Sequence, residues 1–417
     1  MKINKFENYG LELPFGEEVI STAGKLVPGT SFVDIRVQAL RLPPEKLLER
    51  LKKPFEANFS AGIWFFGSVN SRFHLPYKDD LTIEERLEIA GELSKYGLKA
   101  VEAHYPWEIN EENVHLYKDL EKRFGLKVSV VGGIGGDFRQ RDAQFGTLSS
   151  PIKEVREKYL KDTIEGLELA KELNALAVCW PGIDGYTYSL GTHFQDMWDR
   201  FEAAMAKALD EVPCVRLALE PKPYEPAINN IYRTTADGIL MARDVEARLK
   251  NPENRKLLSQ GHTIVALNPE VGHVRMGFED VAYAYARVLR EARLAHVHLN
   301  SQPLGNYDQD LNVGVVAPET TEALLFVLRL YGYTGYLGID INPERMPVQV
   351  ALVNSFNAIH LANGVIDNLD YEQVLECYFN PHRKRGELEN LLTQARAEGV
   401  DKSRFVPLDD VLSSIKS

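Results

Sequence analysis

The stretch "HVHLNSQPLGNYDQDLNVG", residues 296–314, joins a short apolar strand to a polar loop. His298 and Asn300 stand near the end of the strand, and Asp308 and Asp310 follow in the loop, separated by one residue. Packing of a core strand does not require an imidazole at its end or two carboxylates in the loop that follows. Because buried ionisable groups are costly unless they are paired or bind a cation, this stretch predicts that the strand ends at a functional site.

Strands of similar character recur along the chain, and each is followed by a helical pattern, which indicates βα units and a parallel sheet. The predicted strands are 61–69, 100–106, 127–134, 175–182, 216–223, 263–273, 295–302 and 336–343. Eight such units favour a closed (β/α)8 TIM barrel over an open sheet, and no dinucleotide-binding fingerprint follows the first strand.

The sequence predicts three segments. An N-terminal extension covers residues 1–58, the (β/α)8 catalytic barrel covers 59–345, and a helical tail covers 346–417. The tail has a helical pattern and no linker-like composition, so we expect it to pack on its own barrel or on a neighbouring subunit.

Composition narrows the functional classes. The 417 residues carry a formal net charge of −12, which argues against a nucleic-acid or anionic-membrane surface. Three widely spaced cysteines do not suggest a disulfide framework. The first residues lack an apolar signal core, so we expect a cytoplasmic enzyme without a membrane segment.

Ionisable residues gather at the predicted strand ends, which is where a barrel places its active site. One group could surround a single ion: Glu220, Glu270, His298 and Asp340. A second ion could be shared by Glu270 and held by His273, Asp308 and Asp310. Oxygen-rich shells with one imidazole suit Mg, Mn or Co, whereas Zn usually takes fewer oxygens.

Simpler interpretations exist for each residue. A single carboxylate at a strand end is often a helix N-cap or part of a surface ion pair, and a lone buried histidine is usually a hydrogen-bonded core residue. We expect His296 to be such a core histidine. The coincidence of ligand-type residues at several strand ends on one rim favours the metal interpretation.

The same residues resemble the xylose isomerase family. "EPKPYEP" (220–226), "NPEVGH" (268–273) and the loop after the seventh strand match that family's motifs, over about residues 60–345. The resemblance implies aldose–ketose isomerisation by a metal-assisted 1,2-hydride shift, with two divalent ions (Mn, Co or Mg) per subunit. It also implies roles for Trp64 and Trp180 as walls of the sugar site, and for His104 in ring opening.

Three positions depart from this family. His298 stands where xylose isomerases carry an aspartate ligand, Trp107 where they have the aspartate that orients the histidine, and Tyr224 replaces an asparagine. All three resemble the L-rhamnose isomerases of the Pseudomonas type. The resemblance therefore leaves the identity of the sugar open.

Further roles follow from the resemblance. Lys222 would donate to the substrate carbonyl oxygen, and Asp308 would ligate the second, mobile ion and take part in catalysis. Asn300 would contact the substrate or support the metal ligands, and Trp107 would contact the substrate. A homotetramer or homodimer is expected, in which an aromatic residue of a neighbouring subunit closes the site; Phe73 is the candidate.

Three functions remain open. The first is the sugar isomerase. The second is another enzyme on the same barrel, either a sugar epimerase, which needs two facing carboxylate bases and one ion, or an abasic-site endonuclease, which needs a histidine-rich zinc cluster and a basic face. The third is a non-catalytic carbohydrate-binding relative, which is expected to lose Lys222, His104 or the Asp308/Asp310 pair.

Overall fold

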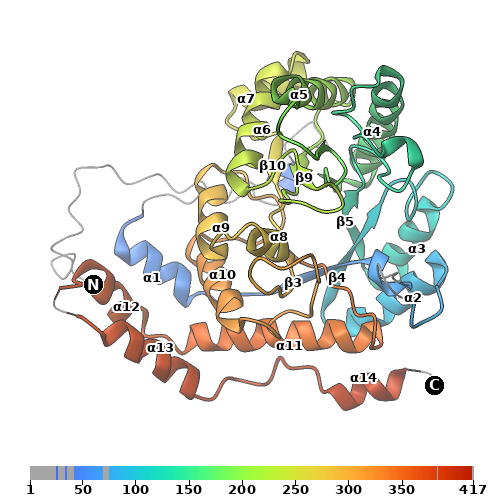
Figure 1. The fold of residues 1–417 in the computed structure, drawn as a ribbon. Helices are drawn as coiled ribbons and strands as arrows, with labels where there is room; N and C mark the ends of the chain where they lie inside the picture. The colour runs from blue at the N-terminus through green and yellow to red at the C-terminus, as the bar shows by residue number, and fades with distance from the viewer. Residues whose placement is uncertain (1–24, 27–32, 35–41, 69–74, 383, 416–417) are drawn as a thin grey trace.

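The structure is a computed structural model that describes residues 25–26, 33–34, 42–68, 75–382 and 384–415. Its centre is one eight-stranded parallel sheet surrounded by helices (Figure 1). The strands follow one another around the sheet in the order β10-β8-β6-β5-β4-β3-β12-β11. Their bounds are β3 Asn58–Gly62, β4 Leu98–His104, β5 Lys127–Gly132, β6 Leu176–Cys179, β8 Leu217–Leu219, β10 Val265–Leu267, β11 His298–Leu299 and β12 Tyr336–Ile339.

The two ends of this sheet are joined by isolated parallel bridges. Leu267 pairs with Leu294, and Glu270 pairs with His298, so the segments that carry β10 and β11 lie side by side. All neighbouring strands in the sheet pair in parallel. The TIM-barrel prediction is confirmed.

Helices cover the outside of the sheet and separate successive strands. Their bounds are α2 Ile83–Leu93, α3 Val114–Phe124, α4 Lys153–Leu173, α5 Phe194–Glu211, α6 Thr235–Arg248, α7 Pro252–Ser259, α8 Val271–Met276, α9 Val281–Arg290 and α10 Pro318–Leu330. Short 3-10 turns occur at η3 Ile63–Phe66, η4 Ser94–Tyr96 and η5 Arg141–Ala143, and β7 Gly185–Tyr186 pairs with β9 Asn229–Asn230 above the barrel. Among the described residues, no helix is both long enough and apolar enough to cross a membrane.

The first strand differs from its predicted range of 61–69. β3 ends at Gly62, and the chain then turns through η3, which carries Trp64. A Cβ on Gly62 would lie 2.1 Å from the Trp64 ring, so glycine allows the indole to fold back over the strand end. The predicted strand at 263–273 is also shorter, because α8 begins at Val271, directly after Pro269 and Glu270.

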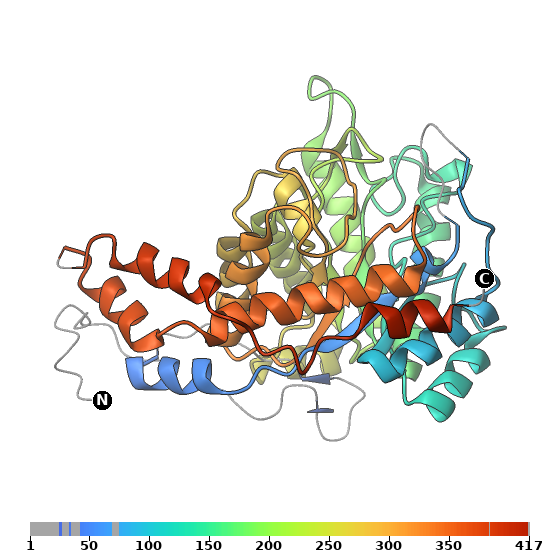
Figure 2. The same cartoon turned by 90° about the horizontal axis from the view of Figure 1, so that it is seen from below.

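The C-terminal residues form four helices. They are α11 Val348–Asp367, α12 Tyr371–Phe379, α13 Glu387–Ala397 and α14 Leu408–Ser414. Phe356 of α11 stacks on Phe59 of β3 with ring centroids 4.1 Å apart, so α11 packs against the barrel wall. Figure 2 shows α14 beside α11, and α1 Pro44–Lys52 near α12.

A buried arginine ties these outer segments together. Arg329 of α10 donates to Asn363 Oδ1 and Asp367 Oδ1 of α11, and also to the carbonyl of Leu51 in α1. These contacts link both flanking segments to the barrel. The division of the chain at residues 58 and 345 stays a prediction, and β1 Lys25–Leu26 with β2 Val33–Asp34 forms a small antiparallel pair near the N-terminus.

Candidate active site

The carboxyl ends of the barrel strands surround a cavity of about 300 Å³. This is near the lower end of the size range of small-molecule sites. Its lining includes nearly all of the predicted site residues: Trp64, His104, Trp107, Trp180, Glu220, Lys222, Glu270, His273, His298, Asp308, Asp310 and Asp340. Phe73 lies outside the described residues.

Four ligand-type side chains meet at the base of this cavity. One donor atom from each of Glu220, Glu270, His298 and Asp340 lies within 4.8 Å of the others. His298 Nδ1 is 3.0 Å from Glu220 Oε2 and 3.3 Å from Asp340 Oδ2. Yet Nδ1 has no hydrogen-bond partner among the described residues, so this nitrogen lies close to both carboxylates without being bonded to either.

A second group shares Glu270 with the first. Its donor atoms, from Glu270, His273 and Asp308, also lie within 4.8 Å of one another. His273 Nε2 is 3.1 Å from Glu270 Oε2 and 3.4 Å from Asp308 Oδ2. Asp310, predicted as a further ligand, lines the cavity but does not belong to this tight group; its Oδ1 accepts a hydrogen bond from Asn300 Nδ2.

The electrostatics of the two groups fit divalent cations. Burial, together with the carboxylates of Asp308 and Asp310, raises the pKa of Glu270 well above its ordinary value. Burial and the carboxylate of Asp308 likewise raise the pKa of Asp310. These shifts reflect more buried negative charge than the neighbouring lysine and histidines neutralise, and a bound cation would remove the repulsion.

Lys222 is the buried cation of the site. Its Nζ lies 2.6 Å from Asp308 Oδ2 and 4.9 Å from the centre of the Trp180 ring. Although burial lowers it, Asp308 raises the pKa of Lys222 above its ordinary value, so the ammonium stays charged. Its remaining N–H groups are available to a ligand in the cavity.

Asn300 does not line the cavity but contacts two of the candidate metal ligands. Its amide nitrogen donates to Glu270 Oε1 at 2.8 Å and to Asp310 Oδ1 at 2.9 Å. One side chain therefore fixes a carboxylate from the β10 end and another from the loop that follows β11.

His104 is oriented by a residue that the sequence interpretation did not identify. That interpretation placed Trp107 where an orienting aspartate was expected, but Glu108 Oε2 lies 2.8 Å from His104 Nδ1. The same oxygen also accepts from the backbone N–H of His104, and Arg86 Nη1 lies 3.7 Å from Glu108 Oε1. Since an ionised carboxylate only accepts, Nδ1 donates to Glu108, and in the neutral imidazole Nε2 is the nitrogen that carries the lone pair.

Aromatic rings form a wall along one side of the cavity. His104 lies between Trp64 and Trp107, with ring centroids 4.4 and 4.9 Å away, and Trp64 Nε1 donates to Asp340 Oδ1 at 2.9 Å. Phe138, which the sequence interpretation missed, packs edge-on against both Trp107 and Trp180. Its position after β5, in a glycine-rich stretch, gave no pattern that marks it as a site residue.

Comparisons with known proteins show the family of the chain. A family model described as xylose isomerase-like TIM barrel matches residues 90–354. The xylose isomerase of Thermus thermophilus is 30% identical over 300 residues, covering 68% of this chain and 71% of that protein. The xylose isomerase of Thermus caldophilus is 29% identical over 308 residues, covering 70% of this chain and 74% of that protein.

Among solved structures, a D-tagatose 3-epimerase-like protein has the same fold, with a TM-score of 0.53 at 16% identity, covering 76% of this chain and 99% of that one. This likeness concerns the fold alone. The family match and the two curated relatives together establish that the chain belongs to the xylose isomerase-like TIM barrel family.

Proposed function

We propose that this protein is a metal-dependent aldose–ketose isomerase that acts on a small sugar by a 1,2-hydride shift. The observation that carries the proposal is the pair of ligand groups that share Glu270, with a charged lysine and an oriented histidine in the same cavity. The xylose isomerase activity named for the two Thermus relatives points the same way.

Glu220, Glu270, His298 and Asp340 would hold one cation, and Glu270, His273 and Asp308 the other, with Asp310 as a further ligand. When bound, the cations supply Lewis-acid polarisation of the carbonyl and a water of lowered pKa. The mixed carboxylate and imidazole shells suit Mn, Co or Mg.

The chain's own groups account for the proton movements. With Nδ1 bonded to Glu108, Nε2 of the neutral His104 ring accepts the hydroxyl proton as the sugar ring opens. Lys222 then donates a hydrogen bond to the carbonyl oxygen as negative charge develops there. The hydrogen on C2 moves to C1 with its electron pair, and the proton of the C2 hydroxyl moves to the oxygen on C1, so the product is the ketose.

The aromatic wall would exclude water during this transfer, which strengthens the electrostatic contribution of Lys222. Trp64, Trp107, Trp180 and Phe138 present apolar ring surface to the cavity, while the cation ligands lie at its base. The polar groups would therefore fix the hydroxyls of the sugar, and the rings would pack on its carbon skeleton.

A sugar epimerase on the same barrel is the alternative, and a deoxyhexose isomerase of the L-rhamnose type is the variant suggested by His298, Trp107 and Tyr224. The pairing of Lys222 with Asp308 favours the isomerase, because an epimerase that works through two carboxylate bases has no use for a buried ammonium beside the cation.

The test is an assay of metal-free protein reloaded with Mg, Mn or Co. We expect ketose formation from one or more of xylose, glucose, rhamnose, lyxose and mannose, and the ranking of these sugars would identify the substrate class. The absence of ketose with every metal, alongside conversion of a ketose into its C3 epimer, would replace the isomerase with the epimerase.

A further inference from the structure

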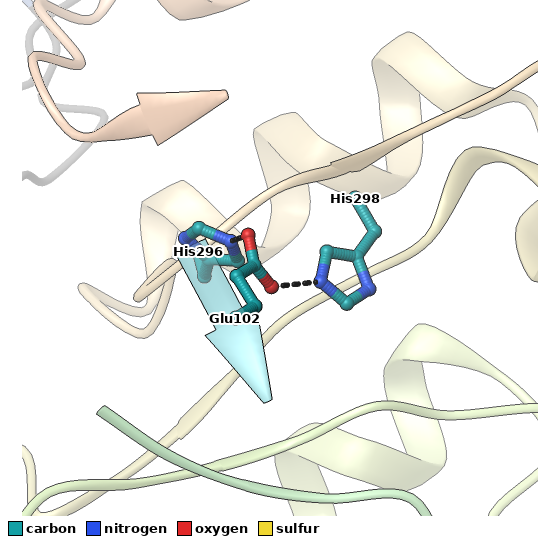
Figure 3. Close-up of side chains that lie close together, drawn as sticks. All are labelled: Glu102, His296 and His298. Atoms are coloured by element: carbon teal, nitrogen blue, oxygen red, sulfur yellow. Dashed lines mark hydrogen bonds and ion pairs between the residues drawn. The ribbon is translucent and has the colours of Figure 1, made fainter. Parts of the chain in front are cut away.

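A fully buried carboxylate, Glu102, lies beneath the candidate metal centre and outside the cavity lining. It is in the middle of β4, two residues before His104 and on the same face of the strand. Its Oε2 is 2.8 Å from His298 Nε2 and its Oε1 is 2.9 Å from His296 Nε2. Figure 3 shows the carboxylate of Glu102 facing both imidazole rings. Ser60 Oγ of β3 also donates to Oε1, at 2.5 Å.

The space for Glu102, His296 and His298 depends on the absence of a side chain at Gly338. Gly338 of β12 pairs with His298 of β11, and a Cβ at position 338 would lie 2.5 Å from His296 Nε2 and 2.7 Å from Glu102 Oε1. Any side chain there would displace one of the two groups. The space for the carboxylate and both imidazoles is therefore built into the packing of β12 against its neighbours.

The contact decides which nitrogen of His298 carries a proton. An ionised carboxylate is an acceptor only, so Nε2 donates to Glu102, and in the neutral ring that a bound cation requires, Nδ1 carries the lone pair. Nδ1 is also the atom that faces Glu220 and Asp340 at 3.0 and 3.3 Å without a hydrogen-bond partner among the described residues. The two nitrogens of the His298 ring thus have different roles: Nε2 bonds to Glu102, and Nδ1 faces the candidate metal site.

We propose that Glu102 is a positioning residue that fixes the ring orientation and the Nε2–H tautomer of His298, and so presents Nδ1 as a ligand to the first cation. The inference rests on the proposed function, because it requires a cation at Glu220, Glu270, His298 and Asp340. Carboxylates that orient a metal-binding histidine in this way raise its basicity and typically strengthen metal binding ten- to a hundredfold.

His296 and Ser60 act on Glu102 rather than on the cation. They bond the oxygen that His298 does not use, which leaves the carboxylate no freedom to rotate away. A third metal ion among Glu102, His296 and His298 would need both Nε2 atoms unprotonated. It would have to displace two hydrogen bonds of normal length, and His298 would have to bridge two ions.

Glu102→Gln tests the proposal, with metal affinity measured by calorimetry on the full chain. The glutamine side chain has nearly the same shape, but its amide group would turn a donor toward His298 Nε2 and favour the wrong tautomer. We expect first-site affinity to fall on the order of ten- to a hundredfold, second-site affinity to hold, and Glu102→Asp to recover part of the loss.

Two further variants separate positioning from a general structural effect. Glu246 is a buried carboxylate that accepts from the backbone of Ile264 and Val265 and pairs with Arg293, so Glu246→Gln is a matched control that should leave metal affinity unchanged. In a His298→Gln background, Glu102→Gln should cause no additional loss, because its effect passes through the imidazole.

The outcomes are distinct. Wild-type protein that binds no divalent metal would overturn the proposed function and this inference together. Metal binding by the wild type with first-site affinity unchanged in Glu102→Gln, or with the same loss repeated in the His298→Gln background, would overturn the positioning role alone. If Glu102→Gln does not fold, ¹⁵N NMR of the Mg-loaded wild type decides: the His298 proton on Nε2 supports the proposal, and a proton on Nδ1 overturns it.

Discussion

Lys222 Nζ lies 2.6 Å from Asp308 Oδ2, so the one buried ammonium among the described cavity residues is paired with a carboxylate that the proposed second cation also needs. Both groups are held charged by this contact, since Asp308 raises the pKa of Lys222 against the effect of burial, and Lys222 lowers the pKa of Asp308 against the same effect. The Lys222–Asp308 contact therefore links the residue proposed to donate to the carbonyl oxygen with a proposed ligand of the second cation.

Lys222→Met should keep the fold and metal binding but lower kcat by about two to three orders of magnitude, because a charge-assisted hydrogen bond to the developing oxyanion is lost. Steady-state kinetics with the best aldose measure this. Lys171→Met, which removes a lysine that donates to the carbonyl of Pro213 away from the cavity, is the control and should turn over normally. More than about a tenth of wild-type activity in Lys222→Met would remove the lysine from the mechanism.

Asp308→Asn combined with Asp310→Asn should weaken the second ion and spare the first, because three of the four first-site ligands, Glu220, His298 and Asp340, do not belong to the second group. Calorimetry should then show one tight site in place of two, with sugar binding retained. Two unchanged sites would mean that these aspartates are only part of a polar loop.

Metal preference should follow from His298. An imidazole favours later transition metals over Mg, which has little to gain from a nitrogen ligand. We expect Mn or Co to activate better than Mg, and His298→Asp to narrow the difference. Affinity at the first site should also fall as pH drops, beginning above the ordinary imidazole range. Although burial lowers it, Glu220 and Glu102 raise the pKa of His298 in the metal-free protein, and protonation of Nδ1 competes with the ion. Full activity with modest Mg, together with an unchanged preference in His298→Asp, would show that His298 is not a ligand.

The contribution of Asp340 to the stability of the metal-free protein should fall as pH rises. Burial, opposed by His298 and assisted by Glu220, raises the pKa of Asp340 from 3.8 to about 6. A folded-state pKa above the unfolded value gives stability that is fully present below pH 3.8 and is lost as pH rises through about 6. Asp340→Asn should therefore gain stability relative to the metal-free wild type across this window, and lose it once metal is added.

Urea unfolding with and without divalent metal, at several pH values, checks this prediction. A stability difference between Asp340→Asn and wild type that does not change with pH would mean that Asp340 is not strained by its neighbours in the metal-free state.

The barrel and most of the cavity could be predicted because the strand pattern and the strand-end motifs are local in sequence. Glu220, Glu270 and Asp340 each lie within three residues after the end of a strand, and parallel strands must bring such ends to one rim. The sheet ladders are shorter than predicted at several places, because η3 and α8 begin within the apolar runs and carry Trp64 and His273.

The contacts of Glu102 and Glu108 could not be predicted from the sequence pattern. Glu102 lies between Val101 and Ala103 in the middle of β4. Its partners His296 and His298 are almost 200 residues away in the sequence, so only the closed barrel reveals the contact. The alternation of Glu102 with His104 on one strand face was the available signal. Glu108 is one residue past the position where an orienting carboxylate was expected, and the local turn decides which side chain reaches His104.

The reaction of an aldose labelled with deuterium at C2 tests the central claim most directly. With Mn- or Co-loaded protein in ordinary water, we predict a ketose that keeps the deuterium on C1, because a hydride shift moves that atom directly between the two carbons. A ketose whose C1 carries hydrogen from water, or a product epimerised at C3 with no ketose formed from any aldose, would contradict the account.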